Sequence, residues 1–151
     1  MIVLDTNVIS ELMRPQPEPR VLAWADGLDP DAVAITAMIE AEILHGLARL
    51  PAGRRKQDLQ QSWEALMAEL FTGRILPFTS EAAHWYAELL CRRDRSGRPM
   101  ATADAVIAAT ALTHGASLAT RDGADFAGIG LEVINPWNPS EPPTPINASR
   151  S

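Results

Sequence analysis

The chain opens with a short apolar run that leads directly into polar, turn-forming residues. Residues 2–4 read Ile-Val-Leu, and Asp5, Thr6 and Asn7 follow them. An apolar run of this length, ended by residues that favour turns and helix caps, predicts a buried strand of a parallel sheet. Because ligands and metal ions bind at the carboxyl ends of such strands, Asp5 is placed for function. Capping of the following helix explains Asp5 equally well when it is taken alone.

The rest of the chain alternates between strand and helix patterns. Further strands are expected at residues 32–35, 74–78, 117–120 and 131–134. Apolar residues at helical spacing lie between them, at residues 21–25, 36–50, 59–70, 80–90 and 102–114. The last of these helices should end at Gly115, which suits the left-handed backbone of a helix C-terminus. The alternation predicts an α/β fold of three layers, with a mainly parallel central sheet between helices.

Length and composition fit one domain. The chain has 151 residues, enough to form a stable hydrophobic core without disulfides or a structural metal ion. No apolar stretch approaches the roughly 18 residues needed to cross a membrane, and no basic leader precedes the first strand. Cys91 is the only cysteine, which fits a reducing cytoplasm and a small apolar residue packed on a helix. Because the composition turns proline-rich at Pro136, we expect a domain of residues 1–137 and a disordered tail of residues 138–151.

The charge balance restricts the choice of partners only weakly. A formal net charge of −6 argues against binding of nucleic acid, unless the acidic residues hold a cation that reverses their field locally. The positive charges are nearly all arginines and form two clusters, Arg49, Arg54, Arg55 and Lys56, and Arg92, Arg93, Arg95 and Arg98. Guanidinium groups suit phosphate oxygens, but a solvated helix end or loop explains any single one of them better.

Asp104 is the second acidic candidate. It lies near the start of the helix expected at residues 102–114, on the same face as Ile107, Ala108 and Ala111. Burial of an ionised carboxylate costs several kcal/mol, which the helix N-terminus would offset in part and a metal ion would offset in full. The alternative is a first-turn aspartate that accepts hydrogen bonds from backbone N–H groups.

Two pairs of acidic residues supply further candidates. Glu40 and Glu42 share a helix but project about 200° apart, so at most one can face a given site, and periodicity favours Glu42 weakly. Asp122 follows the strand expected at residues 117–120, as Asp5 follows the first strand. Asp125 is either a second contributor or, more simply, a helix cap.

The candidate ligands are nearly all carboxylates. Several carboxylates without a matching set of histidines or cysteines point to a hard cation, Mg²⁺ or Mn²⁺. His45, His84 and His114 are scattered and form no zinc spacing. No Gly-rich phosphate loop, G-x-S-x-G or H-E-x-x-H motif occurs. Any catalysis would therefore depend on a metal ion that acidic residues bind.

Taken together, these segments resemble the PIN domain, and within it the VapC-type toxins of the FitB-like group. The resemblance extends over residues 1 to 137 and leaves the tail outside it. The matching segments are Ile-Val-Leu-Asp-Thr-Asn-Val-Ile-Ser-Glu-Leu (2–12), Ala-Glu-Ile-Leu-His-Gly (41–46), Gly-Arg-Ile-Leu-Pro-Phe (73–78), Ala-Asp-Ala-Val-Ile-Ala-Ala (103–109), Leu-Ala-Thr-Arg-Asp (118–122) and Ile-Asn-Pro-Trp (134–137).

The resemblance implies an acidic site and an activity. The family's catalytic and metal-binding acids fall on Asp5, Glu42, Asp104 and Asp122. Asn7 and Thr120 correspond to polar residues around them. Many members carry asparagine in place of Asp122 and an acid in place of Asp125, which leaves the fourth acid open. The implied activity is that of a Mg²⁺-dependent endoribonuclease, with Mn²⁺ as a substitute, whose products carry a 3′-hydroxyl and a 5′-phosphate.

The resemblance also implies partners. Such a toxin is paired with a small VapB-like antitoxin, which blocks it and through which it binds operator DNA. Family members commonly form homodimers or larger toxin–antitoxin assemblies. A partner surface would use the apolar residues near the chain start, although ordinary core packing explains most of them: Leu12, Met13, Val21, Leu22 and Trp24.

Two other functions compete with this one. A dehalogenase-like phosphatase also places an aspartate after its first strand, but it needs a second acid two residues later, where this chain has Asn7. A metal-binding α/β module could instead act mainly within an antitoxin-bound, DNA-binding regulatory complex. Cleavage of RNA by the separated chain would distinguish these functions from a ribonuclease.

Overall fold

The structure is a computed structural model, and it describes residues 1–70 and 74–139. The strands are β1 (Ile2–Leu4), β2 (Val33–Thr36), β3 (Ile75–Leu76), β4 (Ser117–Ala119) and β5 (Val133–Ile134). The α-helices are α1 (Thr6–Leu12), α2 (Pro19–Asp26), α3 (Ala37–Ala48), α4 (Arg54–Leu70), α5 (Ser80–Arg95) and α6 (Thr102–Thr113). Short 3₁₀ helices precede β2 and follow β4: η1 (Pro30–Ala32) and η2 (Gly123–Phe126).

The strands form one parallel sheet whose order creates a crevice. The order is β3-β2-β1-β4-β5, and all four neighbouring pairs are parallel. The chain therefore starts at the centre, moves outward to β3, and returns to the other side of β1 for β4 and β5. Sheets of this kind bind ligands at the carboxyl ends of the strands where the order reverses, which here lies between β1 and β4, and we call this part of the molecule the crevice. Leu4 pairs with Ala119 in the register, so Asp5 and Thr120 leave the sheet side by side.

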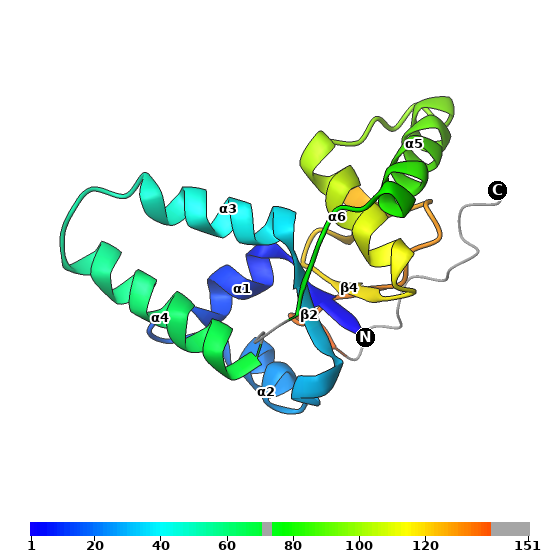
Figure 1. The fold of residues 1–151 in the computed structure, drawn as a ribbon. Helices are drawn as coiled ribbons and strands as arrows, with labels where there is room; N and C mark the ends of the chain where they lie inside the picture. The colour runs from blue at the N-terminus through cyan, green and yellow to red at the C-terminus, as the bar shows by residue number, and fades with distance from the viewer. Residues whose placement is uncertain (71–73, 140–151) are drawn as a thin grey trace.

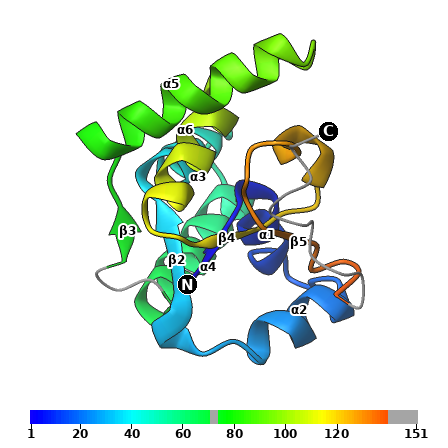
Figure 2. The same ribbon diagram turned by 90° about the vertical axis from the view of Figure 1, so that its right-hand side faces the viewer.

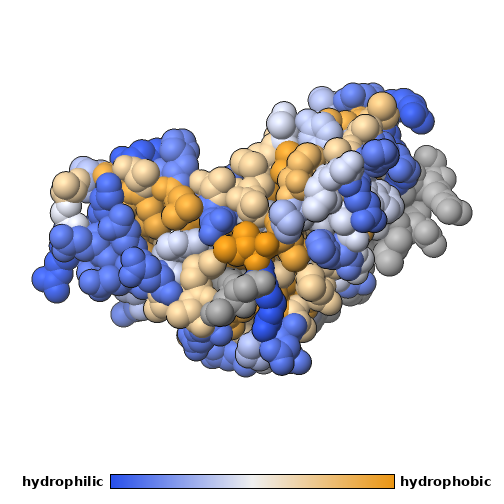
Figure 3. Space-filling model, in the orientation of Figure 1, coloured by the Kyte–Doolittle hydropathy of each residue, from blue (hydrophilic) through white to orange (hydrophobic). Residues whose placement is uncertain are grey.

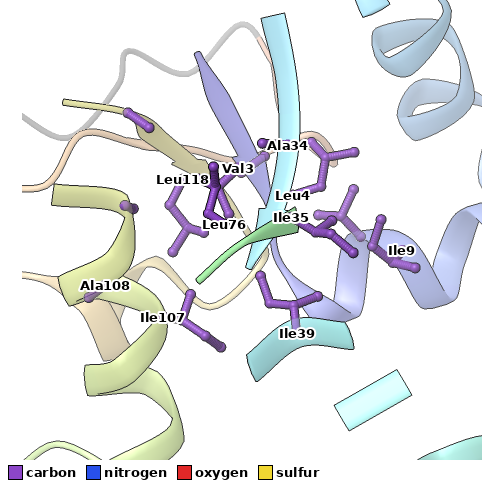
Figure 4. Close-up of a cluster of buried hydrophobic side chains, with 14 of the residues drawn as sticks. Val3, Leu4, Ile9, Ala34, Ile35, Ile39, Leu76, Ile107, Ala108 and Leu118 are labelled. Carbon is purple, nitrogen blue, oxygen red and sulfur yellow. The ribbon is translucent and has the colours of Figure 1, made fainter. Parts of the chain in front are cut away.

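Helices cover both faces of the sheet (Figure 1, Figure 2). In the core, Ile107 of α6 lies on one side of the strands and Ile9 of α1 on the other (Figure 4). Val3 and Leu4 are both fully buried, because successive side chains of a strand point to opposite faces and both faces are covered. The predicted three-layer α/β architecture is confirmed.

Two pairs of helices extend beyond the sheet on opposite sides. The antiparallel helices α3 and α4 project as a hairpin, and α5 packs along α6 (Figure 1). In the space-filling view, the surface is hollowed between these two pairs (Figure 3). The domain thus places a concave surface between two helical walls.

The predicted elements are confirmed, with shifts at their ends. Ala32 belongs to η1 rather than to a strand, and Thr36 ends β2 and caps α3 through a hydrogen bond to the N–H of Ile39. Gly115 follows α6 with φ +60°, as expected for a left-handed helix stop. Most of the tail predicted at residues 138–151 lies outside the described residues, so its disorder stays a prediction.

Some side chains are placed differently from the expectation. Cys91, expected as a packed apolar residue, is exposed on α5. Of the residues near the chain start, Met13 and Val21 belong to the core, whereas Leu22 is 41% exposed. No helix within residues 1–70 and 74–139 has the length and apolar character needed to span a membrane.

Candidate active site

Asp5 occupies the crevice between β1 and β4. Its side chain is only 6% exposed, and it caps α1 by accepting the N–H of Thr6 at Oδ1 over 2.8 Å. The hydroxyl of Thr120 donates to Oδ2 over 2.8 Å. The capping and the functional explanations of Asp5 are therefore compatible, because one oxygen caps the helix while the other faces the carboxyl end of β4.

Asn7 connects the two sides of the crevice. Its Nδ2 lies 3.1 Å from the carboxylate of Asp122, 3.1 Å from the hydroxyl of Thr120 and 3.4 Å from the carboxylate of Asp5. Its Oδ1 accepts the backbone N–H of Arg121 over 3.1 Å, which orients the amide so that the NH₂ group faces the carboxylates. Asn7 thus spaces two carboxylates that would otherwise repel each other.

Of the two glutamates on α3, Glu42 contacts a residue next to Asp5. The hydroxyl of Thr6 donates to Oε1 of Glu42 over 2.7 Å, so α3 contributes this carboxylate to the crevice. Among the described residues, Glu40 has no such partner in the site. Sequence reasoning did not assign a role to Thr6. Its position directly after Asp5, at the start of α1, was the available signal.

Asp104 reaches the same region from α6. It lies in the first turn of the helix and is half-buried, and no described residue donates a hydrogen bond to its carboxylate. Burial raises its pKa to about 6, together with repulsion from other carboxylates, of which Asp5 is the strongest, then Asp125, Glu42 and Asp122. The explanation of Asp104 as a carboxylate satisfied by backbone N–H groups is therefore wrong. The carboxylate is available to a cation.

Burial also raises the pKa of Asp5, against the hydrogen bonds of Thr120 and Thr6, which lower it. The charges of Glu42 and Asp122 add to the increase. Asp5 and Asp104 thus both experience the neighbouring acids as repulsive charges. Clustered carboxylates of this kind favour binding of a cation, because the cation removes the repulsion.

The sequence left Asp122 and Asp125 as alternatives for the fourth acid. Asp122 is the N-cap residue of η2, so the expectation that Asp125 provides a cap is wrong. Asp122 is joined to Asp5 through Asn7, whereas Asp125 lies within η2 and acts on Asp104 through its charge. Both acids therefore lie within electrostatic reach of the crevice.

The chemistry of the side chains fits a hard divalent cation, although their placement does not yet form a closed metal site. The candidate ligands are all carboxylate oxygens, which Mg²⁺ and Mn²⁺ prefer. Within residues 1–70 and 74–139, no three acidic, histidine or cysteine side chains form a group ready to hold a metal ion.

A groove of about 630 Å³ opens beside the acid site, between α1, α3 and α4. Thr6, Asn7 and Glu42 line its end at the acids, and apolar residues such as Leu47 and Leu59 line its walls. Four arginines line it as well: Arg14, Arg49, Arg55 and Arg121.

Three of these guanidinium groups are free to bind an anion. Arg14 pairs with Glu11 over 3.0 Å, and Arg121 stacks on Trp137 with its charge 4.9 Å from the ring centre. In the part of the chain that the structure describes, Arg49, Arg55 and Arg121 have no acidic partner. In an acidic protein, unpaired guanidinium groups along one groove favour an anionic ligand.

Comparison with known proteins agrees with this geometry. The PIN domain family matches residues 2–130. The chain is 44% identical to the VapC ribonuclease Y4jK of Sinorhizobium fredii, over 93% of this chain and 100% of that protein. It is also 44% identical to the toxin FitB of Neisseria gonorrhoeae, over 91% of this chain and 99% of that protein.

Solved structures give the same result. A structure of FitAB bound to an IR36 DNA fragment superposes with a TM-score of 0.84 at 44% identity, over 91% of this chain and 96% of that chain. A crystal structure of FitAcB from Neisseria gonorrhoeae superposes with a TM-score of 0.82 at 45% identity, over 91% and 99%. The chain therefore belongs to the PIN domain family, in the group that includes the VapC and FitB proteins.

Proposed function

We propose that this PIN domain is a metal-dependent endoribonuclease and the toxin of a type II toxin–antitoxin system. The observation that carries the proposal is the convergence of four carboxylates on one crevice, from Asp5, Glu42, Asp104 and Asp122. The similar proteins named as a VapC ribonuclease and as the toxin FitB support the same activity.

PIN-domain ribonucleases generally depend on divalent metal ions. We propose Mg²⁺ here, with Mn²⁺ as a substitute, because all the candidate ligands are carboxylate oxygens. Asp5 and Asp104 would be the main ligands, and Glu42 and Asp122 would hold a second ion or the water around the first. What the bound ion supplies is a water molecule of lowered pKa and neutralisation of charge on the phosphoryl oxygens.

The polar neighbours of the acids keep the carboxylates oriented. Thr120 and the N–H of Thr6 bind the two oxygens of Asp5, so its rotation is restricted. The hydroxyl of Thr6 orients Glu42, and the amide of Asn7 orients Asp122. Residues that hydrogen-bond to metal ligands fix the geometry of those ligands. Loss of these hydrogen bonds should therefore weaken metal binding, even though the residues themselves do not contact the metal.

The substrate that fits the groove is single-stranded RNA. The unpaired charges of Arg49, Arg55 and Arg121 can each contact a phosphate, and the groove leads to Glu42 at the acid site. Phosphate contacts of this kind would guide the backbone of an RNA strand along the groove toward the carboxylates.

A small VapB-like antitoxin is the proposed partner, and operator DNA would be bound only through it. The similar FitAB and FitAcB structures support this pairing. We further propose a homodimer or a larger toxin–antitoxin assembly. We also propose a cytoplasmic location, because a single cysteine fits a reducing compartment and the RNA substrate is present there. The names of the relatives give no support to a dehalogenase-like phosphatase or to a purely regulatory module.

Cleavage of total RNA by the antitoxin-free protein tests the activity. We expect cleavage with Mg²⁺ that is lost on chelation and lost in the Asp5→Ala variant, and products that carry a 5′-phosphate. Asp94→Asn, at an exposed acid of α5, is the matched control and should cleave like the wild type. Products that end in a 2′,3′-cyclic phosphate would contradict the mechanism. Equal cleavage by the wild type and by Asp5→Ala would contradict the site.

The fourth acid is tested separately with Asp122→Asn and Asp125→Asn. Because Asp122 is tied to Asp5 through Asn7, we expect its variant to lose the larger part of the activity. A larger loss in Asp125→Asn would assign the role to Asp125 instead.

A further inference from the structure

Arg93 carries a buried charge that the acid site described above does not use. It lies on α5 and is only 6% exposed. In the described residues, no carboxylate pairs with it. Its guanidinium group is bound by backbone carbonyls, with Nε donating to the oxygen of Arg98 over 2.6 Å and Nη1 donating to those of Asp125 and Ala127 over 2.9 and 3.0 Å. A buried guanidinium group that loses its hydrogen bonds is strongly unfavourable. Movement of the carbonyls away from Arg93 is therefore costly, and the residue holds these backbone segments in place.

These carbonyls belong to the two segments that carry three of the acids. Asp125 and Ala127 belong to η2 and its end, and η2 begins directly after Asp122. Arg98 belongs to the connection between α5 and α6, six residues before Asp104 in the sequence. Arg93 therefore ties the segment after β4 to the segment that leads into α6.

Arg98 strengthens the same connection from the surface. Its Nη2 donates to the carbonyl of Ala124 over 3.2 Å, and its backbone N–H donates to the carbonyl of Arg93 over 3.0 Å. Three carbonyls of the η2 segment are thus bound by two arginines of one cluster. The expectation that these arginines are solvated holds for Arg95, which is exposed, but it is wrong for Arg93.

We propose that Arg93 is a positioning residue that fixes the segment of Asp122 and Asp125 against the segment of Asp104, and so sets the spacing of the acids for their metal ion. The inference rests on the proposed function and adds to it a residue that binds backbone carbonyls, and whose charge acts on Asp125 and Asp104 over a longer distance. The contact between α6 and η2 shows that these two segments pack directly against each other. Arg93 bonds to the η2 side of that contact and, on the other side, to the connection that leads into α6.

The guanidinium group suits this role better than any other side chain. It is planar and donates in several fixed directions, so a single group can bind carbonyls on separate segments. Lysine presents a compact ammonium group without this fork, and glutamine lacks the charge and most of the donors. Lysine should therefore preserve part of the function, and glutamine less.

The test measures Mn²⁺ binding by calorimetry in the absence of RNA, for the wild type and for the Arg93→Gln and Arg93→Lys variants. We expect Arg93→Gln to weaken Mn²⁺ binding about 10-fold or more, as for other groups that orient metal ligands, and Arg93→Lys to be intermediate. Arg95→Gln, at an exposed arginine of the same helix, is the matched control and should bind like the wild type.

Two further readouts separate positioning from a general loss of structure. In Arg93→Gln, hydrogen exchange should become faster at the η2 amides of Asp125 and Ala127, which donate within the segment in the wild type. The cleavage rate should recover at saturating Mn²⁺, so that the metal requirement changes more than the maximal rate. Unchanged Mn²⁺ affinity together with unchanged exchange in η2 would overturn the inference.

A second variant decides the matter if Arg93→Gln does not fold. Arg98→Gln removes the exposed guanidinium contact with Ala124 and keeps the buried charge, and it should accelerate exchange in η2 and weaken Mn²⁺ binding to a lesser degree. No change in either would overturn the inference. If the wild type binds Mn²⁺ and cleaves RNA, and the variants do so equally well, only the role of Arg93 is contradicted and the proposed function stands. A wild type that does neither would contradict the proposed function itself.

Discussion

At the scale of single residues, Asp104 offers the most direct measurement of the acid site. Its pKa of about 6 lies above its ordinary value of 3.8, because burial and the neighbouring carboxylates disfavour the charged form. In the metal-free protein we expect its carboxyl ¹³C signal to titrate near pH 6, and Mg²⁺ to shift this titration to lower pH. A signal that titrates near pH 4 without metal would contradict the electrostatic description of the site.

The same shift predicts how stability depends on pH. Between about pH 4 and pH 6 the folded protein binds the Asp104 proton more tightly than the unfolded chain, so this contribution is present at low pH and is lost as the pH rises through 6. After allowance for solvent screening of a half-exposed group, the loss should be about 1 kcal/mol. Urea unfolding at pH 4.5 and pH 7.5 measures it, with Asp104→Asn expected to show a smaller change than the control Asp94→Asn.

The individual residues also show what the sequence could and could not reveal. Asp5 and Asp122 were identified because strand ends are readable from apolar runs. Glu42 was preferred to Glu40 through the match of residues 41–46 to the family, whereas helical periodicity favoured it only weakly, because the hydrogen bond from the hydroxyl of Thr6 to Glu42 is made only in the fold. Arg93 was readable in principle. Its spacing of four and eleven residues from the buried Leu89 and Ala82 places it on the buried face of α5.

At the scale of the elements, two glycines predict opposite responses to the same substitution. Gly115 has φ +60° and a Cβ there would meet no atom within 4 Å, so Gly115→Ala should cost only the backbone strain, about 1 kcal/mol. Gly46 lies within α3, and a Cβ there also meets nothing within 4 Å, so Gly46→Ala should stabilise by about 0.5–1 kcal/mol. Chemical unfolding of the two variants checks both signs. Stabilisation by Gly115→Ala would contradict the left-handed helix end.

The α3–α4 hairpin predicts where RNA binds. In the Asp5→Ala background, which removes cleavage, Arg49→Ala combined with Arg55→Ala should weaken binding of single-stranded RNA. The slope of log K against log salt should decrease in magnitude by about 0.7 for each phosphate that an arginine no longer neutralises. Arg54→Ala is the control, because Arg54 faces Asp58 over 3.9 Å and does not line the groove. Fluorescence anisotropy at several salt concentrations measures the slopes. Equal slopes for all variants would contradict a role of this groove in binding phosphates.

The elements were predictable from local patterns, but the groove was not. Apolar spacing identified the helices that became α3 and α4, and Gly115 marked the end of α6, because these signals act over a few residues. The groove is lined by side chains of α1, α3 and α4, so it depends on how these helices are placed relative to one another. Figure 1 shows that α3 and α4 project away from the sheet. Contacts between segments far apart in the sequence set this placement, and no local pattern records them.

At the scale of the whole molecule, parallel topology and charge combine to define the site. The strand order could not be read from the sequence, yet the parallel sheet already required that Asp5 and Asp122 emerge at one edge. The reversal of order between β1 and β4 then brings them together, and α3 and α6 add Glu42 and Asp104. In a chain of net charge −6, several of the negative charges thus lie close together at the carboxyl ends of the central strands. Without a bound cation, the repulsion between these carboxylates lowers the free energy of unfolding of the domain.

This repulsion makes metal binding measurable as a change in the stability of the whole domain. An ion that binds only the folded chain, at ten times its dissociation constant, stabilises it by about 1.4 kcal/mol, or about 3–6 °C in midpoint for a domain of this size. We expect Mg²⁺ to raise the thermal midpoint of the wild type, and this increase to be lost in Asp5→Asn and Asp104→Asn. Asp58→Asn, at an exposed acid of α4, controls for general salt effects. Because Asp104→Asn removes a repelling charge and no hydrogen bond, this variant should be at least as stable as the wild type before Mg²⁺ is added. An equal increase in all four proteins would mean that the ion acts on the surface as a whole, and that these carboxylates do not bind it.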